Sequence, residues 1–168
     1  MAEAPLTGAE DGGGSGGGSG GGNTDPALDF CIRLARAYAV LTRRLDNKLS
    51  GVHGLSFSDF MVLYSLDRAD GQRLRRIDLA ERMGMTASGV TRMLLPLEKI
   101  GLVSRQADPR DARVGFATLT RAGSDLLGHA LKSAEAICQE AIQPVPGEQV
   151  QALLGILGQL AGMHLANS

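Results

Sequence analysis

Residues 76–105 read RIDLAERMGMTASGVTRMLLPLEKIGLVSR, and this stretch decides the fold. Apolar side chains at helical spacing predict a short helix over about 75–83 and another over about 87–100. Gly84 is expected to form the turn between them, Thr86 to cap the second helix and Gly101 to end it. A helix pair joined by a tight turn with glycine is typical of a helix-turn-helix.

Two segments of alternating hydrophobicity follow the helix pair, at 102–106 and 114–119. They are separated by a polar turn over 107–112 that contains Pro109. The pattern predicts a two-stranded hairpin, which makes the motif a winged helix-turn-helix centred on 72–121.

The flanking segments predict further helices. Thr24, Asp25 and Pro26 form a helix-start signal, and Ser56 opens another helix with Asp59 as an acidic partner in its first turn. The expected helices outside the motif cover about 25–50, 56–68, 121–142 and 147–165, and 72–74 is a short extended piece. The fold class is mainly α with a small β-hairpin wing, flanked by N- and C-terminal dimerisation helices.

Composition limits the kind of protein. Residues 12–22 read GGGSGGGSGGG, so 1–24 are expected to be a disordered tail, either natural or an added linker. Residues 25–168 are long enough for a single domain, with a lobe at 55–121 and dimerisation helices at 25–50 and 122–168. Two cysteines without a CxxC spacing, no segment able to span a bilayer and no secretory signal predict a cytoplasmic protein.

Charge is distributed unevenly along the chain. The formal net charge is −1, but 71–121 holds ten basic and five acidic residues, so the remainder carries −6. A basic segment within an otherwise acidic chain is typical of a protein that presents one face to phosphates. A split of this size also arises by chance in proteins without nucleic-acid partners.

The second helix of the pair carries the first candidate DNA contacts. Ser88, Thr91 and Arg92 lie on the face opposite its apolar positions, and small neighbours would allow a close approach to the major groove. The helix N-terminus at Thr86 offers amides and a positive dipole to a phosphate. An ordinary surface helix would show the same polar face.

The hairpin tip carries the second set of candidate contacts. Arg110 at the tip of a protruding loop could enter the narrow minor groove, and Asp108 could hold its guanidinium in place. Arg113 lies on the same turn. The alternative is a solvated turn whose exposed ion pairs contribute little.

Taken together, these motifs resemble the MarR family of bacterial regulators. The resemblance rests on 76–83, 86–92 and 97–105, and continues through 108–113 and Leu119-Thr120-Arg121-Ala122-Gly123. It implies an obligate homodimer that reads a pseudo-palindromic operator at the bacterial nucleoid, most often as a repressor. By the same match, Ser88, Thr91 and Arg92 would face the major groove, Arg110 the minor groove with Asp108 orienting it, and Arg113 a phosphate or the wing itself.

Two features of the predicted helices bear on DNA contact and on dimerisation. Pro96 inside the recognition helix is expected to bend it beyond the DNA-contacting turns. A near-heptad stripe of Leu127, Leu131, Ala134, Cys138 and Ala141, with a second apolar stripe in the last helix, predicts association between subunits. A compact monomeric bundle is the alternative.

The resemblance also implies a sensor. Many members of the family bind anionic, often aromatic, molecules in a cleft between the dimerisation helices and the lobe. In this chain the candidate residues for lining such a cleft are Tyr38, Arg44, His53, Phe57 and Met61. The aromatic and methionine side chains would otherwise be ordinary core. Peroxide sensors of the family place a cysteine near Cys31, but Phe57 replaces an expected tyrosine, so oxidant sensing is an alternative.

Other classes find little support. The three histidines are far apart and no metal site or cofactor is predicted. Catalytic motifs are missing, apart from Gly/Ser matches within 12–22 that carry no meaning, so an enzyme is not expected. A winged helix that binds protein instead of DNA is the alternative of another class, and the wing arginines argue against it.

Overall fold

The computed structural model describes residues 25–107 and 115–166. The elements follow in the predicted order: α1 (Pro26–His53), α2 (Phe57–Asp67), η1 (Asp70–Gln72), β1 (Arg73–Arg75), α3 (Arg76–Met83), α4 (Ala87–Lys99), β2 (Val103–Ala107), β3 (Gly115–Leu119), α5 (Arg121–Ile142) and α6 (Gly147–Ala166). The mainly helical fold with a hairpin wing is confirmed. The first strand lies one residue later than expected, because 70–72 form a turn of 3-10 helix.

Side-chain caps define where the helices begin. Ser56 and Asp59 form a reciprocal capping box at α2. Thr86 Oγ1 accepts the Gly89 amide at 3.1 Å, and Thr120 Oγ1 accepts the Gly123 amide at 3.0 Å. Each cap satisfies an amide that would otherwise lack an intrahelical acceptor. The predicted starts of α2, α4 and α5 are therefore confirmed.

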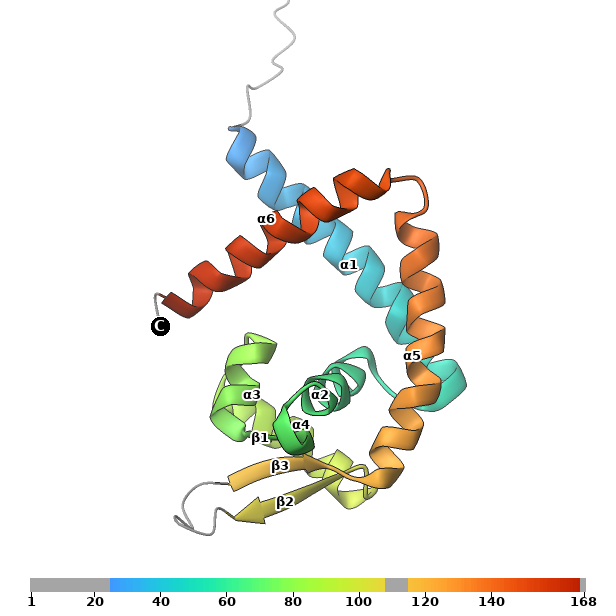
Figure 1. Ribbon diagram of the computed structural model, residues 1–168, viewed down its shortest axis with the longest axis vertical. Coiled ribbons are helices and arrows are strands. Elements are labelled where there is room, and N and C mark those ends of the chain that lie inside the picture. Colours follow the sequence, from blue (N-terminus) through green and yellow to red (C-terminus); the bar gives the residue numbers. More distant parts are fainter. Residues whose placement is uncertain (1–24, 108–114, 167–168) are drawn as a thin grey trace, which may run out of the picture.

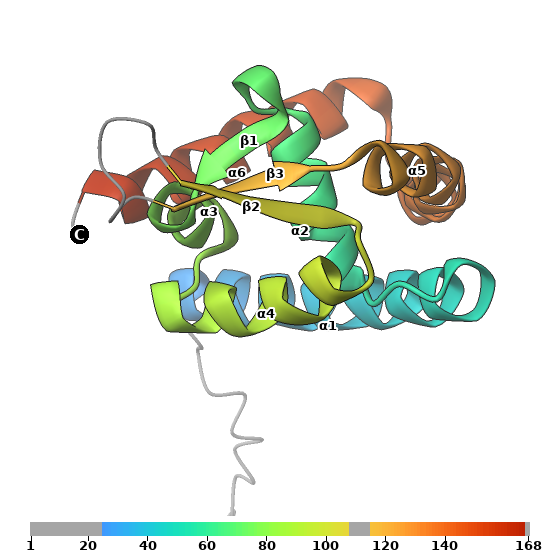
Figure 2. The same ribbon diagram turned by 90° about the horizontal axis from the view of Figure 1, so that it is seen from below.

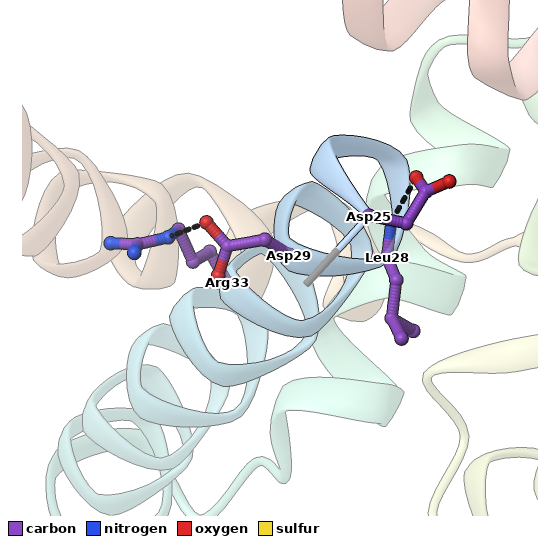
Figure 3. A network of polar contacts seen from close by, with 4 residues as sticks. All are labelled: Asp25, Leu28, Asp29 and Arg33. Atoms are coloured by element: carbon purple, nitrogen blue, oxygen red, sulfur yellow. Dashed lines mark hydrogen bonds and ion pairs between the residues drawn. The ribbon is translucent and has the colours of Figure 1, made fainter. Parts of the chain in front are cut away.

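The start of α1 is capped in the same way, by Asp25 (Figure 3). Its Oδ1 accepts the amides of Ala27 at 2.7 Å and Leu28 at 3.4 Å, and Pro26 occupies the first helical position. One turn further, Arg33 Nε donates to Asp29 Oδ2 at 2.7 Å on an exposed face. The helix runs to His53, beyond the expected end at about residue 50, and Gly54 ends it in the left-handed region with φ of 67°.

The strands form an antiparallel sheet with the order β1-β3-β2. Arg73–Arg75 pairs with β3 in the register Leu74 opposite Ala117, and Val103 pairs with Leu119. Figure 1 shows β2 and β3 at the bottom of the view, with α2 and α3 above them. The inward positions Leu74, Val103, Ala117 and Leu119 are buried, which follows from the two-residue repeat of a strand.

The core of this winged lobe (α2 to β3, residues 57–119) forms around α2. This helix contacts α1, α3, α5, β1 and β3. Val62, Leu63 and Leu66 on α2 are completely buried, and Leu79 from α3 and Val90 from α4 meet them. Because α3 packs on α2, and α4 packs on α3 and β2, the outer face of α4 is held in a fixed orientation.

The apolar stripe of α5 corrects one expectation. Leu127 and Ala134 are buried within the chain itself, where α5 packs on α1 and α2. They therefore cannot be the surface that meets another subunit. Ile100, the last residue of the helix expected over about 87–100, is 65% exposed because α4 already ends at Lys99 and the chain turns at Gly101.

The unfilled apolar surface lies instead on α1 and α6, called the frame below. Their exposed large apolar side chains are Leu28, Phe30, Ile32, Leu34, Tyr38, Val40, Val52, Leu153, Leu154, Ile156, Leu157 and Leu160. Although α6 crosses α1 in the view of Figure 1, the turned view of Figure 2 separates the two helices in depth. Among the described residues, no helix has both the length and the apolar character that crossing a membrane requires.

Candidate nucleic-acid interface

The outer face of α4 presents the predicted contact residues. Ser88 and Arg92 are exposed and Thr91 is half-buried, while Val90 and Leu94 on the opposite face are fully buried. Helix α4 continues through Pro96, which lies in its last turns beyond these side chains. The arrangement leaves the first two turns of α4 open to a partner.

Hydrogen bonds at the start of α4 decide whether the hydroxyls of Thr86 and Thr91 are free to donate or to accept. The Thr86 hydroxyl accepts the Gly89 amide, so its own hydrogen stays available for donation. The Thr91 hydroxyl donates to the Ala87 carbonyl at 2.9 Å, which leaves its oxygen as an acceptor. Thr86 is therefore suited to a phosphate oxygen, and Thr91 to a donor such as a base amino group.

The strands of the predicted wing are confirmed. Ala107 at the end of β2 pairs with Gly115 at the start of β3, which closes the described part of the hairpin. Asp108, Arg110 and Arg113 lie outside the described residues, so their roles stay predictions.

A hollow beside α4 contains residues that the sequence did not single out. Its volume is about 430 Å³, and it is lined by Arg75, Arg76, Ile77, Ala87, Ser88, Thr91 and Gly115. The only signals in the sequence were the arginine doublet Arg75-Arg76 at the start of α3 and Gly115 within the strand predicted over 114–119. Their meeting depends on the pairing of β1 with β3, which sequence spacing does not specify.

The five predicted effector-pocket residues are not gathered around one cavity. Arg44 pairs with Glu140 at 2.9 Å and lines a cavity of about 510 Å³ between α1 and the end of α5. His53 Nε2 lies 2.9 Å from Ser133 Oγ, which ties α1 to α5. Phe57 and Met61 pack against the core, and Tyr38 is 64% exposed on α1. Arg36, Val40 and Ile142 are the neighbours of Arg44 that sequence reasoning missed.

The two cysteines lie on α1 and α5 and are not bonded to each other. Cys31 is a free, exposed thiol in the first half of α1, and Cys138 is partly buried against the core. Within 25–107 and 115–166, no group of three or more metal-ligating side chains comes together.

Comparison with known proteins identifies the family. A sequence model described as "MarR family" matches residues 55–114. The HTH-type transcriptional regulator MhqR of Bacillus subtilis is 31% identical over 128 residues, which cover 76% of this chain and 86% of MhqR. The chain belongs to the MarR family. It is thus a winged helix-turn-helix transcriptional regulator, and its family is one of regulators rather than of enzymes.

Solved MarR structures share the fold over most of the chain. Sco3205 from Streptomyces coelicolor, a MarR family regulator solved in complex with DNA, has 27% identity and a TM-score of 0.75. The match covers 82% of this chain and 90% of Sco3205. AbsC, another MarR family regulator from Streptomyces coelicolor, has 25% identity and a TM-score of 0.76, covering 86% of this chain and 97% of AbsC.

Proposed function

We propose that this MarR regulator binds double-stranded operator DNA as a homodimer in the cytoplasm and represses transcription. The observation that carries the proposal is the exposed polar face of α4, held beside a wing in the most basic part of the chain. Sco3205, with the same fold, was solved with DNA, and this supports the same partner here.

Each predicted contact has a distinct role in this proposal. Ser88, Thr91 and Arg92 would reach base edges in the major groove, and Arg110, oriented by Asp108, would enter the minor groove. Thr86 and Arg113 would contact phosphates. Because two lobes would be related by a two-fold axis, the operator would be a pseudo-palindrome.

The dimer part of the proposal rests on the frame. An apolar helix as long as α6 is not stable in water without a surface to cover it, yet its described side chains from Gln151 to Gly162 are exposed. The apolar face of α1 also requires a surface that covers it. A second copy offers both surfaces at once, and a two-fold interface would bury them together. In this division, 55–121 form the DNA-binding lobe, and 25–50 with 122–168 form the dimerisation part.

A mobility-shift assay on DNA flanking the protein's own gene tests the proposal. Wild-type protein is expected to bind with an affinity that falls steeply with salt, because phosphate contacts release counterions. Arg110→Ala should weaken binding by about tenfold or more without unfolding the dimer. Arg33→Gln, which removes an arginine from the exposed side of α1, is the control. Equal affinity of Arg110→Ala and Arg33→Gln would contradict the wing assignment.

The effector part of the proposal follows from the cavity at α1 and α5. Arg36 and Arg44 flank apolar side chains there, a combination that suits a small aromatic carboxylate. Adding a panel of aromatic acids to the DNA complex should release it for one member. Arg36→Gln should reduce that response and Arg33→Gln should not. Release that is unaffected by Arg36→Gln would move the effector site elsewhere.

Oxidant sensing through Cys31 is the competing mechanism for release. Cys31→Ser is expected to leave any peroxide response of the DNA complex unchanged. Loss of the response in that variant would favour oxidation of the exposed thiol over binding of an aromatic acid.

A further inference from the structure

The hollow between the start of α4 and the start of β3 brings an arginine pair to the junction of recognition helix and wing. Ala87, Ser88 and Thr91 form the α4 side of the hollow, and Gly115 forms the β3 side. Arg75 and Arg76 come from the end of β1 and the start of α3. Three separate segments of the chain therefore meet at one opening beside the exposed face of α4.

Arg76 is positioned by the missing side chain of Gly115. A Cβ placed on Gly115 would lie 3.1 Å from Arg76 Nη2, 3.3 Å from Nε and 3.4 Å from Cζ. These distances are shorter than ordinary van der Waals contacts, so the guanidinium lies close against the strand backbone. A methyl group at position 115 would require the Arg76 guanidinium to shift by a few tenths of an ångström, and a larger side chain would displace it further.

Phe116 restricts the neighbouring arginine. The Arg75 guanidinium carbon lies 5.9 Å from the centre of the Phe116 ring, and that of Arg73 lies 5.1 Å from the same ring. Stacking of this kind holds a guanidinium without neutralising its charge. Among the described residues, none of the three arginines is in an ion pair.

The chemistry of the hollow favours an anion with several oxygens. The planar guanidinium of Arg76 can donate two parallel hydrogen bonds to one phosphate group. Ser88 is exposed, and its hydroxyl can donate a further bond. Thr91 is less suited, because its hydroxyl already donates to Ala87. Ala87 and Ser88 on the α4 side of the hollow are exposed, so a phosphate could reach them while still attached to a duplex.

We infer that Arg76, held against Gly115 and assisted by Arg75 and Ser88, binds one backbone phosphate of the DNA that α4 reads. The inference rests on the proposed DNA-binding function and adds a contact that links recognition helix, wing base and α3. Arg76 then contributes to affinity for any duplex and carries no base preference of its own.

Fluorescence anisotropy with an operator duplex and an unrelated duplex, each at several salt concentrations, tests this inference. Arg76→Gln is expected to weaken binding to both duplexes by about the same factor, roughly fivefold or more, and to reduce the salt slope by about one. Gly115→Ala should weaken binding in the same direction although it removes no charge. The double variant should bind about as weakly as Arg76→Gln alone, because Gly115→Ala acts only by displacing the Arg76 guanidinium.

Two controls separate the local contact from general effects. Lys132→Gln removes one positive charge on α5, away from the hollow, and is expected to change affinity less than about twofold. Gly128→Ala adds the same methyl group where nothing lies within 4 Å. If Gly115→Ala fails to fold by circular dichroism, the comparison of Arg76→Gln with Lys132→Gln still decides the matter.

The outcomes distinguish this inference from the proposed function. If wild-type protein binds neither duplex, the proposed function fails. If wild-type protein binds and Arg110→Ala weakens binding while Arg76→Gln behaves like Lys132→Gln, the inference alone is overturned. Calorimetric titration of inorganic phosphate into free protein gives the remaining arm. Phosphate binding that is lost in Arg76→Gln, with DNA affinity unchanged, would make the hollow a site for a free anion and would also overturn it.

Discussion

The winged lobe and the frame differ in what covers their apolar side chains. In the lobe, Leu63, Leu79 and Leu94 are buried almost completely by the chain itself. In the frame, Leu28 on α1 and Leu154 on α6 are 55% and 56% exposed. Helical periodicity identified an apolar face in both regions. Periodicity therefore locates an apolar face, whereas the surface that covers this face depends on the tertiary and quaternary arrangement.

The largest expected effect comes from placing charge on the frame. Leu154→Glu combined with Leu157→Glu should raise the dimer dissociation constant by about a hundredfold or more, since unpaired carboxylates in an apolar interface cost several kcal/mol. Sedimentation velocity over a range of concentrations measures this. Gln159→Glu, a charge change on the opposite side of α6 by helical spacing, is the control. A double variant that remains dimeric would show that α6 is not part of the interface.

Truncation of a core side chain in the lobe should give the next largest effect. Leu63→Ala is expected to lower the free energy of unfolding by about 2–5 kcal/mol, because Leu63 is fully buried in α2. Urea unfolding followed by circular dichroism measures it. Leu95→Ala, at a site 52% exposed on α4, should cost less than about 1 kcal/mol. Similar losses in the two variants would contradict the difference in burial.

Two glycines of α5, the helix that follows the lobe, should change the free energy of unfolding in opposite directions when replaced by alanine. A Cβ on Gly123, in the first turn of α5, would collide with the Leu102 carbonyl and the Leu119 side chain. Gly123→Ala should therefore lower the free energy of unfolding by about 1–3 kcal/mol. Gly128→Ala, with open space around it, should raise that free energy by up to about 1 kcal/mol through helix propensity. Thermal melting of both variants would show whether the signs differ.

The smallest expected effect concerns the exposed ion pair near the start of α1. Arg33→Gln removes the pairing with Asp29 seen in Figure 3 and should change the free energy of unfolding by less than about 0.5 kcal/mol. Urea unfolding at low and moderate salt measures it. A loss above about 1 kcal/mol at both salt concentrations would mean that this side of α1 belongs to a buried interface.

Local signals in the sequence predicted most of the lobe. Ser56, Thr86 and Thr120 predicted helix starts, and Gly84 and Gly101 predicted turns, because capping and left-handed backbone depend on neighbouring residues only. The stripe of α5 was assigned to a partner subunit, yet Leu127 and Ala134 face the chain's own core. Such a choice depends on how α1 and α2 pack, which no local pattern contains.

The candidate site was predictable to a similar extent. The polar face of α4 followed from helical spacing, and Ser88 and Arg92 are exposed as expected. Arg76 and Gly115 were missed because they are distant in sequence and meet only when β1 pairs with β3. The effector residues were predicted as one group, but Arg44 and His53 are engaged by different residues of α5.

In the proposed complex, two lobes joined through the frame read one operator together. The most direct measurement titrates wild-type protein against a duplex with the full inverted repeat and against a duplex with a single half-site, with complex mass determined by light scattering. We expect two chains on the full repeat and at least about a hundredfold weaker binding to the half-site. One chain bound per duplex, with equal affinity for both duplexes, would contradict it.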